Sequence, residues 1–137
     1  ELTACFAAMS QLRPQLQSLE QFLAAYRRME PAGYRILAAW DGASVLALAG
    51  YRLQENFVFG RFVYVNDLVT IDSARSRGLG ARLLSQVSSI ALEEKATRLV
   101  LDTRLANTKA QRFYFRAGLL PLALNFSADL GQDKRLP

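Results

Sequence analysis

Two short stretches of this 137-residue chain carry residue types at spacings that could perform chemistry on a bound ligand. The first runs from Arg75 to Ala81 and reads RSRGLGA, directly before a segment with helical apolar periodicity. Gly78 and Gly80 lack a Cβ, so a diphosphate could approach the backbone N–H groups at the positive end of a helix. Arg75 and Arg77 add mobile positive charge. The stretch predicts a phosphate-binding loop.

The second stretch, residues 107–118, reads as a helix that carries a tyrosine. Asn107 or Thr108 would cap its start, and Gly118 stands where a left-handed residue commonly ends a helix. Phe113 and Tyr114 lie about 100° apart around such a helix, so one ring can pack in the core while the phenol faces a cleft. A phenol in a cleft can act as a general acid.

Several other chemistries are excluded. The loop lacks the Gly-Lys-Ser/Thr ending of a nucleotide-binding P-loop, and the third glycine of a dinucleotide-binding fingerprint is absent. The chain has no histidine, which removes Ser-His and Cys-His nucleophiles and most zinc sites, so we expect no metal. One cysteine, Cys5, excludes an internal disulfide and fits a reducing compartment, so we expect a cytoplasmic protein with this thiol buried.

Charge and hydropathy narrow the partners. The net charge is +5, but the basic residues are spread out and not interleaved with aromatic ones, which favours a phosphate-bearing small molecule over nucleic acid. No apolar run approaches the length that spans a bilayer, and no N-terminal segment suggests export, so we expect no membrane partner. A homodimer stays open.

The periodicity predicts a single α+β domain over residues 1–137, with a mostly antiparallel sheet flanked by helices. A first helix would end before Pro14, and Ser18 with Gln21 forms a capping box for a second. Asp41-Gly42 predicts a hairpin. The expected order is two helices, three meander strands, a helix, a strand, a helix and final strands, with strands at 34–40, 45–53, 61–71, 98–103 and 119–130. Strict alternation along 61–71 would place Val63, Val65 and Asp67 on one side.

Taken together, the two stretches resemble the signature of the Gcn5-related N-acetyltransferase (GNAT) family. In the first, Arg75, Gly78 and Gly80 follow an apolar strand, as in the family pattern. In the second, Ala110, Phe113-Tyr114 and Gly118 follow Asn107 at the family spacing. The resemblance covers nearly the whole chain. Ser76 departs from it where many members have glycine, and the usual first strand is not seen before the first helix.

The resemblance implies acetyl-CoA as co-substrate and a primary amine as acceptor, small-molecule or peptide, in a ternary complex without an acyl-enzyme. Tyr114 would protonate the departing thiolate as general acid. Coenzyme A would contact the strand end, the loop and the second motif, which are Leu68, Val69, Thr70, Arg75, Ser76, Arg77, Gly78, Leu79, Gly80, Ala81, Asn107 and Tyr114. The N–H of Val69 is the expected oxyanion donor.

The sequence leaves alternatives open for the catalytic base and for the activity. An amine is mostly protonated at neutral pH, so a carboxylate should take its proton. Asp67 is the first candidate and Glu55 the second. The competing functions are a non-catalytic acyl-CoA-binding sensor or partner subunit, which would need the loop but neither Tyr114 nor a base, and an RNA-binding domain that uses the basic charge. The acceptor and the acyl length are not encoded in any recognisable motif.

Overall fold

The computed structural model describes residues 1–131 and 134–137 and divides into two compact units, Glu1–Leu101 and Asp102–Pro137. The first unit contains a four-stranded sheet in the order β1-β2-β3-β4. Strands β1 (Arg35–Asp41), β2 (Ser44–Asn56) and β3 (Gly60–Thr70) form the expected antiparallel meander. The short strand β4 (Leu99–Leu101) runs parallel to β3.

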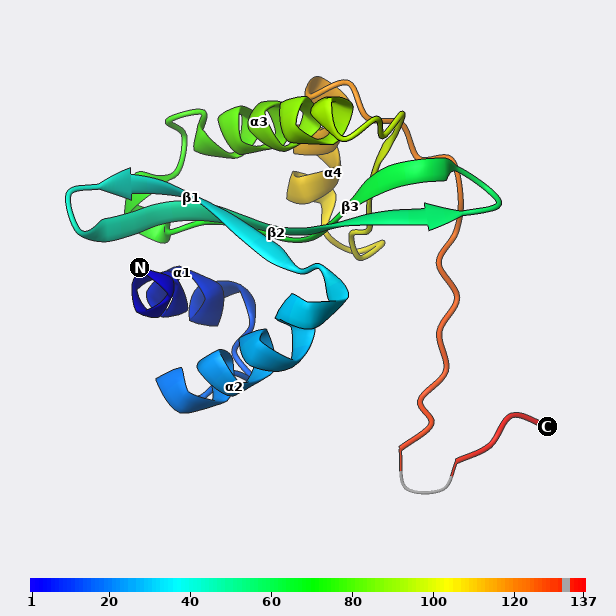
Figure 1. Ribbon diagram of the computed structural model, residues 1–137, viewed down its shortest axis with the longest axis horizontal. Coiled ribbons are helices and arrows are strands. Elements are labelled where there is room, and N and C mark those ends of the chain that lie inside the picture. The colour runs from blue at the N-terminus through cyan, green and yellow to red at the C-terminus, as the bar shows by residue number, and fades with distance from the viewer. Residues whose placement is uncertain (132–133) are drawn as a thin grey trace. The chain divides into compact units, whose positions relative to one another are not determined.

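Helices α1 (Cys5–Leu12) and α2 (Leu19–Met29) cover one face of the sheet (Figure 1). The N–H of Gln21 donates to the Ser18 hydroxyl at 3.1 Å, which confirms the predicted cap of α2. Their apolar sides bury a core against the strands, formed by Cys5, Ala8, Met9, Phe22, Val45, Leu48 and Val69. Short 3-10 turns precede α1 (Leu2–Ala4) and follow α2 (Glu30–Ala32).

Helix α3 (Leu79–Glu93) lies on the opposite face of the sheet and connects β3 to β4 (Figure 1). It buries the stripe Leu83, Leu84, Val87 and Ala91. This crossover lets two parallel strands lie side by side, because a parallel pair cannot be joined by a tight turn. The start of α3 thereby comes directly after the end of β3, through a short 3-10 turn at Asp72–Ala74.

The second unit contains helix α4 (Thr108–Arg116) with the segments on either side of it. Both predicted ends of this helix are confirmed. Asn107 Oδ1 accepts the N–H of Ala110 at 3.1 Å, and Gly118, at φ +89°, closes the other end. There the N–H of Leu119 donates to the Tyr114 carbonyl at 3.0 Å, as in a Schellman motif.

The mixed α+β class and the element order are confirmed up to α4. The strand material predicted at 119–130 forms no strand: residues 119–131 carry neither helix nor strand. Their leucines and phenylalanine supply local preference, but a strand also needs a neighbouring backbone to pair with, and sequence preference alone does not provide one. In the part of the chain that is described, no helix is long and apolar enough to cross a bilayer.

Candidate functional site

The predicted phosphate loop has the backbone conformation that exposes N–H groups. Gly78 is the residue before α3, with φ +74°, and no side chain caps this helix. The first N–H groups of α3, at Leu79, Gly80 and Ala81, therefore have no partner within the helix and face outward at its positive end. A Cβ on Gly78 would meet no atom within 4 Å, so the space beside this residue is open.

Ser76, the departure from the family pattern, adopts φ +65°. This left-handed conformation is one that glycine enters freely and serine enters at a cost of about 1–2 kcal/mol. The backbone at this position thus adopts a conformation that favours glycine, the residue that many members of the family have here. Its N–H can still donate to a bound anion.

The loop is fastened to the body of the first unit. Ala74 is buried, and the N–H of Asp72 donates to the Gln11 side chain of α1 at 3.2 Å. Arg75 forms an ion pair with Asp72 at 2.8 Å, with both side chains largely exposed. A phosphate would compete with this pair for Arg75, whereas no ion pair is found for Arg77 within the described residues.

Backbone groups at the end of β3 lie at an open edge. The last residue of β3 paired with β4 is Val65, which lies opposite Leu101. The N–H of Ile71 donates to Leu46 of β2 at 2.9 Å, and in an antiparallel ladder every second residue points the same way. Val69 therefore also points to β2, while Leu68 and Thr70 point away from it. The prediction that the N–H of Val69 is the oxyanion donor is therefore wrong, because this group points to β2. The N–H of Leu68, which points to the open edge, becomes the candidate.

A β-bulge at Asn66 changes which way the Asp67 side chain points. Gly50 lies opposite Asp67 and Tyr51 lies opposite Val65, so Asn66 is an extra residue on β3. Neighbouring residues of β2 point to opposite faces, and so do the residues paired with them. The expectation that Val65 and Asp67 share one side is therefore wrong, and Asp67 faces α1 and α2 instead.

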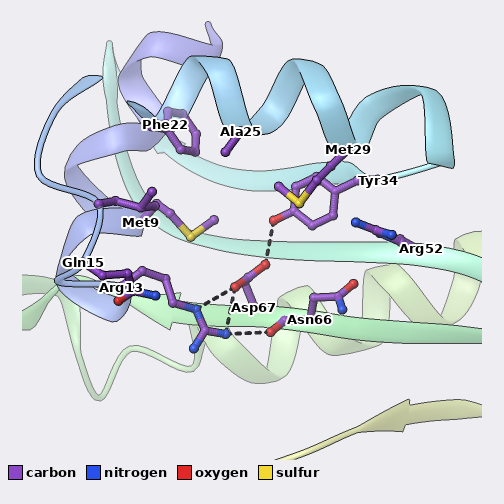
Figure 2. Close-up of a pocket in the computed structure, with 11 residues that line it drawn as sticks. Met9, Arg13, Gln15, Phe22, Ala25, Met29, Tyr34, Arg52, Asn66 and Asp67 are labelled. Atoms are coloured by element: carbon purple, nitrogen blue, oxygen red, sulfur yellow. Dashed lines mark hydrogen bonds and ion pairs between the residues drawn. The ribbon is translucent and has the colours of Figure 1, made fainter. Parts of the chain in front are cut away.

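On this face a cavity of about 320 Å³ opens between the two helices and the sheet (Figure 2). Apolar side chains of α1 and α2 form one wall, and polar groups from β2 and β3 form the other. The lining residues are Met9, Arg13, Gln15, Leu16, Phe22, Ala25, Met29, Tyr34, Arg52, Asn66 and Asp67. Asp67 is the one carboxylate among them, whereas Glu55, the second candidate base, does not line the cavity.

Two donors hold the Asp67 carboxylate. Arg13 Nε donates to Oδ1 at 2.9 Å, and the Tyr34 hydroxyl donates to Oδ2 at 2.7 Å (Figure 2). Arg13 also donates to the carbonyl of the bulged Asn66 at 2.9 Å. The guanidinium thus braces both the carboxylate and the bulge that aims it.

The Tyr34 phenol is buried and donates a hydrogen bond to the Asp67 carboxylate. Burial is the largest effect that raises the pKa of the Tyr34 phenol far above its usual value, and the charge of Asp67 and the hydrogen bond to it raise it further. The hydroxyl therefore stays protonated at neutral pH. This close packing requires Gly50, because a Cβ at that position would overlap the Tyr34 hydroxyl.

In the second unit, Asn107 and Tyr114 lie at the start and near the end of α4. The Asn107 Oδ1 is used to cap the helix, which leaves its Nδ2 group to donate to a ligand. Tyr114 packs edge-to-face against Phe113, with ring centroids 5.4 Å apart. Burial raises the pKa of the Tyr114 phenol, so it holds its proton at neutral pH, as a general acid must.

Sequence reasoning missed four residues of the cavity region: Arg13, Tyr34, Gly50 and Arg52. Arg13 and Asp67 are 54 positions apart, and no periodicity links them. One signal was present, the glycine at position 50 inside an apolar strand, which often marks close approach of another group. Among the described residues, no three His, Cys, Asp or Glu side chains gather as a metal would require.

Comparison with known proteins identifies the family. A model of the acetyltransferase (GNAT) family matches residues 3–119. The chain belongs to the GNAT acetyltransferase family. It is 28% identical over 115 residues to an uncharacterized N-acetyltransferase, YhdJ, of Bacillus subtilis, covering 83% of this chain and 80% of that one. It is 33% identical over 82 residues to an aminoglycoside N(6')-acetyltransferase of Serratia marcescens, covering 57% and 56%.

The fold agrees with the family. The aminoglycoside N-acetyltransferase AAC(6')-Iy, solved in complex with CoA, superposes with a TM-score of 0.82 at 19% identity, over 93% of this chain and 88% of that one. Acetyl-CoA is the co-substrate of GNAT enzymes. The open, uncapped start of α3 and the unpaired edge of β3 in this chain fit its diphosphate and its amide-bearing arm.

Proposed function

We propose that this GNAT protein is an N-acetyltransferase that moves the acetyl group of acetyl-CoA to the primary amine of a small molecule. The observation that supports this most strongly is that β3 links three parts of the first unit. Asp67 lines the cavity, Leu68 and Thr70 offer backbone groups at the open edge, and the strand then leads into the phosphate loop at 75–81. An acceptor in the cavity would thus lie next to the strand edge that suits the co-substrate.

We propose that the two compact units form one acetyltransferase domain over residues 1–137, since the family model spans both. Bound acetyl-CoA supplies a thioester whose carbonyl carbon bonds to the amine nitrogen as the C–S bond breaks. Asp67 attracts the ammonium form of the acceptor and receives its proton, directly or through water. The N–H of Leu68 stabilises the carbonyl oxygen, and Tyr114 donates its proton to the thiolate sulfur. The second proton, which the nitrogen loses as the amide forms, passes through water and restores the Tyr114 phenol.

Coenzyme A is assigned to the backbone and the basic side chains of the predicted set. The strand segment Leu68, Val69 and Thr70 would lie along the pantetheine arm, with Asn107 Nδ2 donating to an amide. The loop from Arg75 to Ala81 would hold the diphosphate through its N–H groups, and Arg77 would add charge without first breaking an ion pair.

Isothermal titration with acetyl-CoA tests this proposal. We expect wild-type protein to bind and Gly80→Glu to lose binding, because the new carboxylate would lie where the phosphates bind. Gln86→Glu is the matched control, since it adds the same charge to an exposed position of α3 away from its start. Equal binding by Gly80→Glu and wild type would refute the loop assignment. Binding without release of free coenzyme A for any amine would favour the acyl-CoA sensor.

A further inference from the structure

The charges that line the cavity do not balance. The three charged lining residues are Arg13, Arg52 and Asp67. Arg13 and Asp67 form an ion pair at 2.9 Å, so the three lining charges sum to one positive charge. The guanidinium of Arg52 forms no ion pair or hydrogen bond with any described residue, so this one positive charge is left without a counter-charge.

Arg52 also carries a buried N–H donor that lacks a hydrogen-bond partner. Its Nε is buried and has no hydrogen-bond partner, the one such side-chain atom found among the described residues. A buried donor without a partner is costly, and more so when it carries charge. Because Nε has almost no accessible surface where it stands, an acceptor removes this cost if the side chain shifts toward a ligand in the cavity.

The position of the guanidinium suits an anionic ligand. Its Cζ lies over the Tyr34 ring, 5.7 Å from the ring centre, in a cation–π contact that limits where the group can lie. A guanidinium held in this way still has N–H groups at its edge, where a carboxylate or phosphate can accept two parallel hydrogen bonds. Figure 2 shows Arg52 and Asp67 on either side of Tyr34.

Tyr34 limits the separation of the two groups. Its hydroxyl lies 2.7 Å from Asp67 Oδ2, and its ring centre lies 5.7 Å from Arg52 Cζ. On β2, Gly50 lies opposite Asp67, and Arg52 follows on the same face two residues later. Because both charged groups contact one tyrosine side chain, a molecule that places an amine at Asp67 and an anion at Arg52 would be short.

We propose that the acceptor is a small amine that also carries an anionic group, a carboxylate or a phosphate, bound by Arg52. This rests on the proposed function and adds the substrate class. It separates this chain from the aminoglycoside N-acetyltransferases that it is similar to, because an aminoglycoside carries several positive charges and would bring them against an uncompensated arginine.

Matched probes test the assignment on the intact chain with coenzyme A present. We would titrate 5-aminopentanoate, its neutral amide, 1,5-diaminopentane and 4-aminobutylphosphonate, and measure acetyl transfer to each in parallel. We expect both anionic probes to bind about 10- to 100-fold more tightly than the amide. The ranking of the carboxylate against the phosphonate then identifies the anion.

Variants assign the preference to one side chain. Arg52→Gln should abolish the preference for anionic probes. Arg52→Lys should keep part of this preference, because lysine retains the positive charge but lacks the two parallel N–H donors of the guanidinium. Arg98→Gln is the control, since Arg98 also lies over a ring, with its Cζ 5.2 Å from the centre of Phe59, but does not line the cavity. Thermal melting of each variant shows that it is folded.

Three results would overturn the inference: equal binding of the amide or diamine, a preference that survives in Arg52→Gln, or no binding of any probe. Transfer to the diamine in the first case would leave the proposed function standing while this inference fails. Conversely, failure of the wild-type protein to bind acetyl-CoA would refute the proposed function. The probe titrations would still decide whether Arg52 binds an anion.

Discussion

Gly50→Ala should be among the most damaging single-methyl changes in this protein. The glycine lies on β2 opposite Asp67 and directly against Tyr34. An added Cβ would overlap the Tyr34 hydroxyl and lie 2.6 Å from Cζ of that ring and 2.8 Å from Asp67 Oδ2. Tyr34 is only 2% exposed, so the ring has little room to move aside.

The cost follows from two losses and one gain. Forcing a buried ring off its position typically costs about 1–3 kcal/mol. Separating the Tyr34 hydroxyl from Asp67 leaves a charged acceptor with one donor fewer, which adds about 1–3 kcal/mol. Replacing glycine in a strand returns up to about 1 kcal/mol of backbone entropy. The net loss is about 1–6 kcal/mol, a large part of the roughly 5–15 kcal/mol that stabilises a typical domain.

Urea denaturation followed by circular dichroism measures this loss. Gly60→Ala is the control, because Gly60 has φ +67° and a Cβ added there would meet no atom within 4 Å, so only the backbone strain of about 1–2 kcal/mol is added. A second comparison repeats Gly50→Ala in a Tyr34→Leu background, where the hydroxyl and ring are gone. There the added methyl should cost less than in the wild-type background.

The steric argument would be refuted by either of two results. One is a free energy of unfolding for Gly50→Ala that equals or exceeds that of Gly60→Ala. The other is a loss of stability at Gly50 that stays the same when Tyr34 is leucine, since the two sites would then not be coupled.

Two further predictions concern the tyrosines. The pKa of Tyr34 is raised above the value of about 10 in an unfolded chain, so its stabilising effect is present below pH 10 and is lost as the pH rises beyond it. Denaturation at several alkaline pH values should show the free energy of unfolding falling by up to about 1.4 kcal/mol per pH unit for this group, and a shallower fall for Tyr34→Phe; equal slopes would contradict the assignment. Tyr114→Phe should lower turnover roughly 10- to 1000-fold while acetyl-CoA binding is kept, with Tyr26→Phe as a control that removes the same oxygen elsewhere. Unchanged turnover in steady-state assays would exclude Tyr114 as the general acid.

Features that depend on neighbouring residues could be predicted from the sequence. The caps at Ser18 and Asn107 and the left-handed Gly118 are set by contacts within a few residues, and all three form as expected. The loop before α3 is of the same kind, because Gly78 and the start of the helix are adjacent in the chain.

Features that depend on contacts between distant parts of the chain could not be predicted from the sequence. The bulge at Asn66 is a property of how β2 and β3 align, and it reverses the face on which Asp67 lies. Arg13 joins the carboxylate from a segment far away in the chain, so nothing local marks it. The segment 119–130 shows the converse, since strand-like composition did not produce a strand.

On β3, main-chain groups suit the co-substrate and side chains suit the acceptor, and this difference has a consequence for how such a protein can evolve. The groups of β3 that suit the co-substrate are main-chain N–H and C=O groups, which every residue except proline supplies and which side-chain substitutions largely leave in place. The groups suited to the acceptor are side chains on the cavity wall, each replaceable by one mutation. New acceptors can therefore be explored by drift at positions such as Arg52 while the co-substrate is retained, so that specificity can diverge quickly within a lineage whose chemistry does not change.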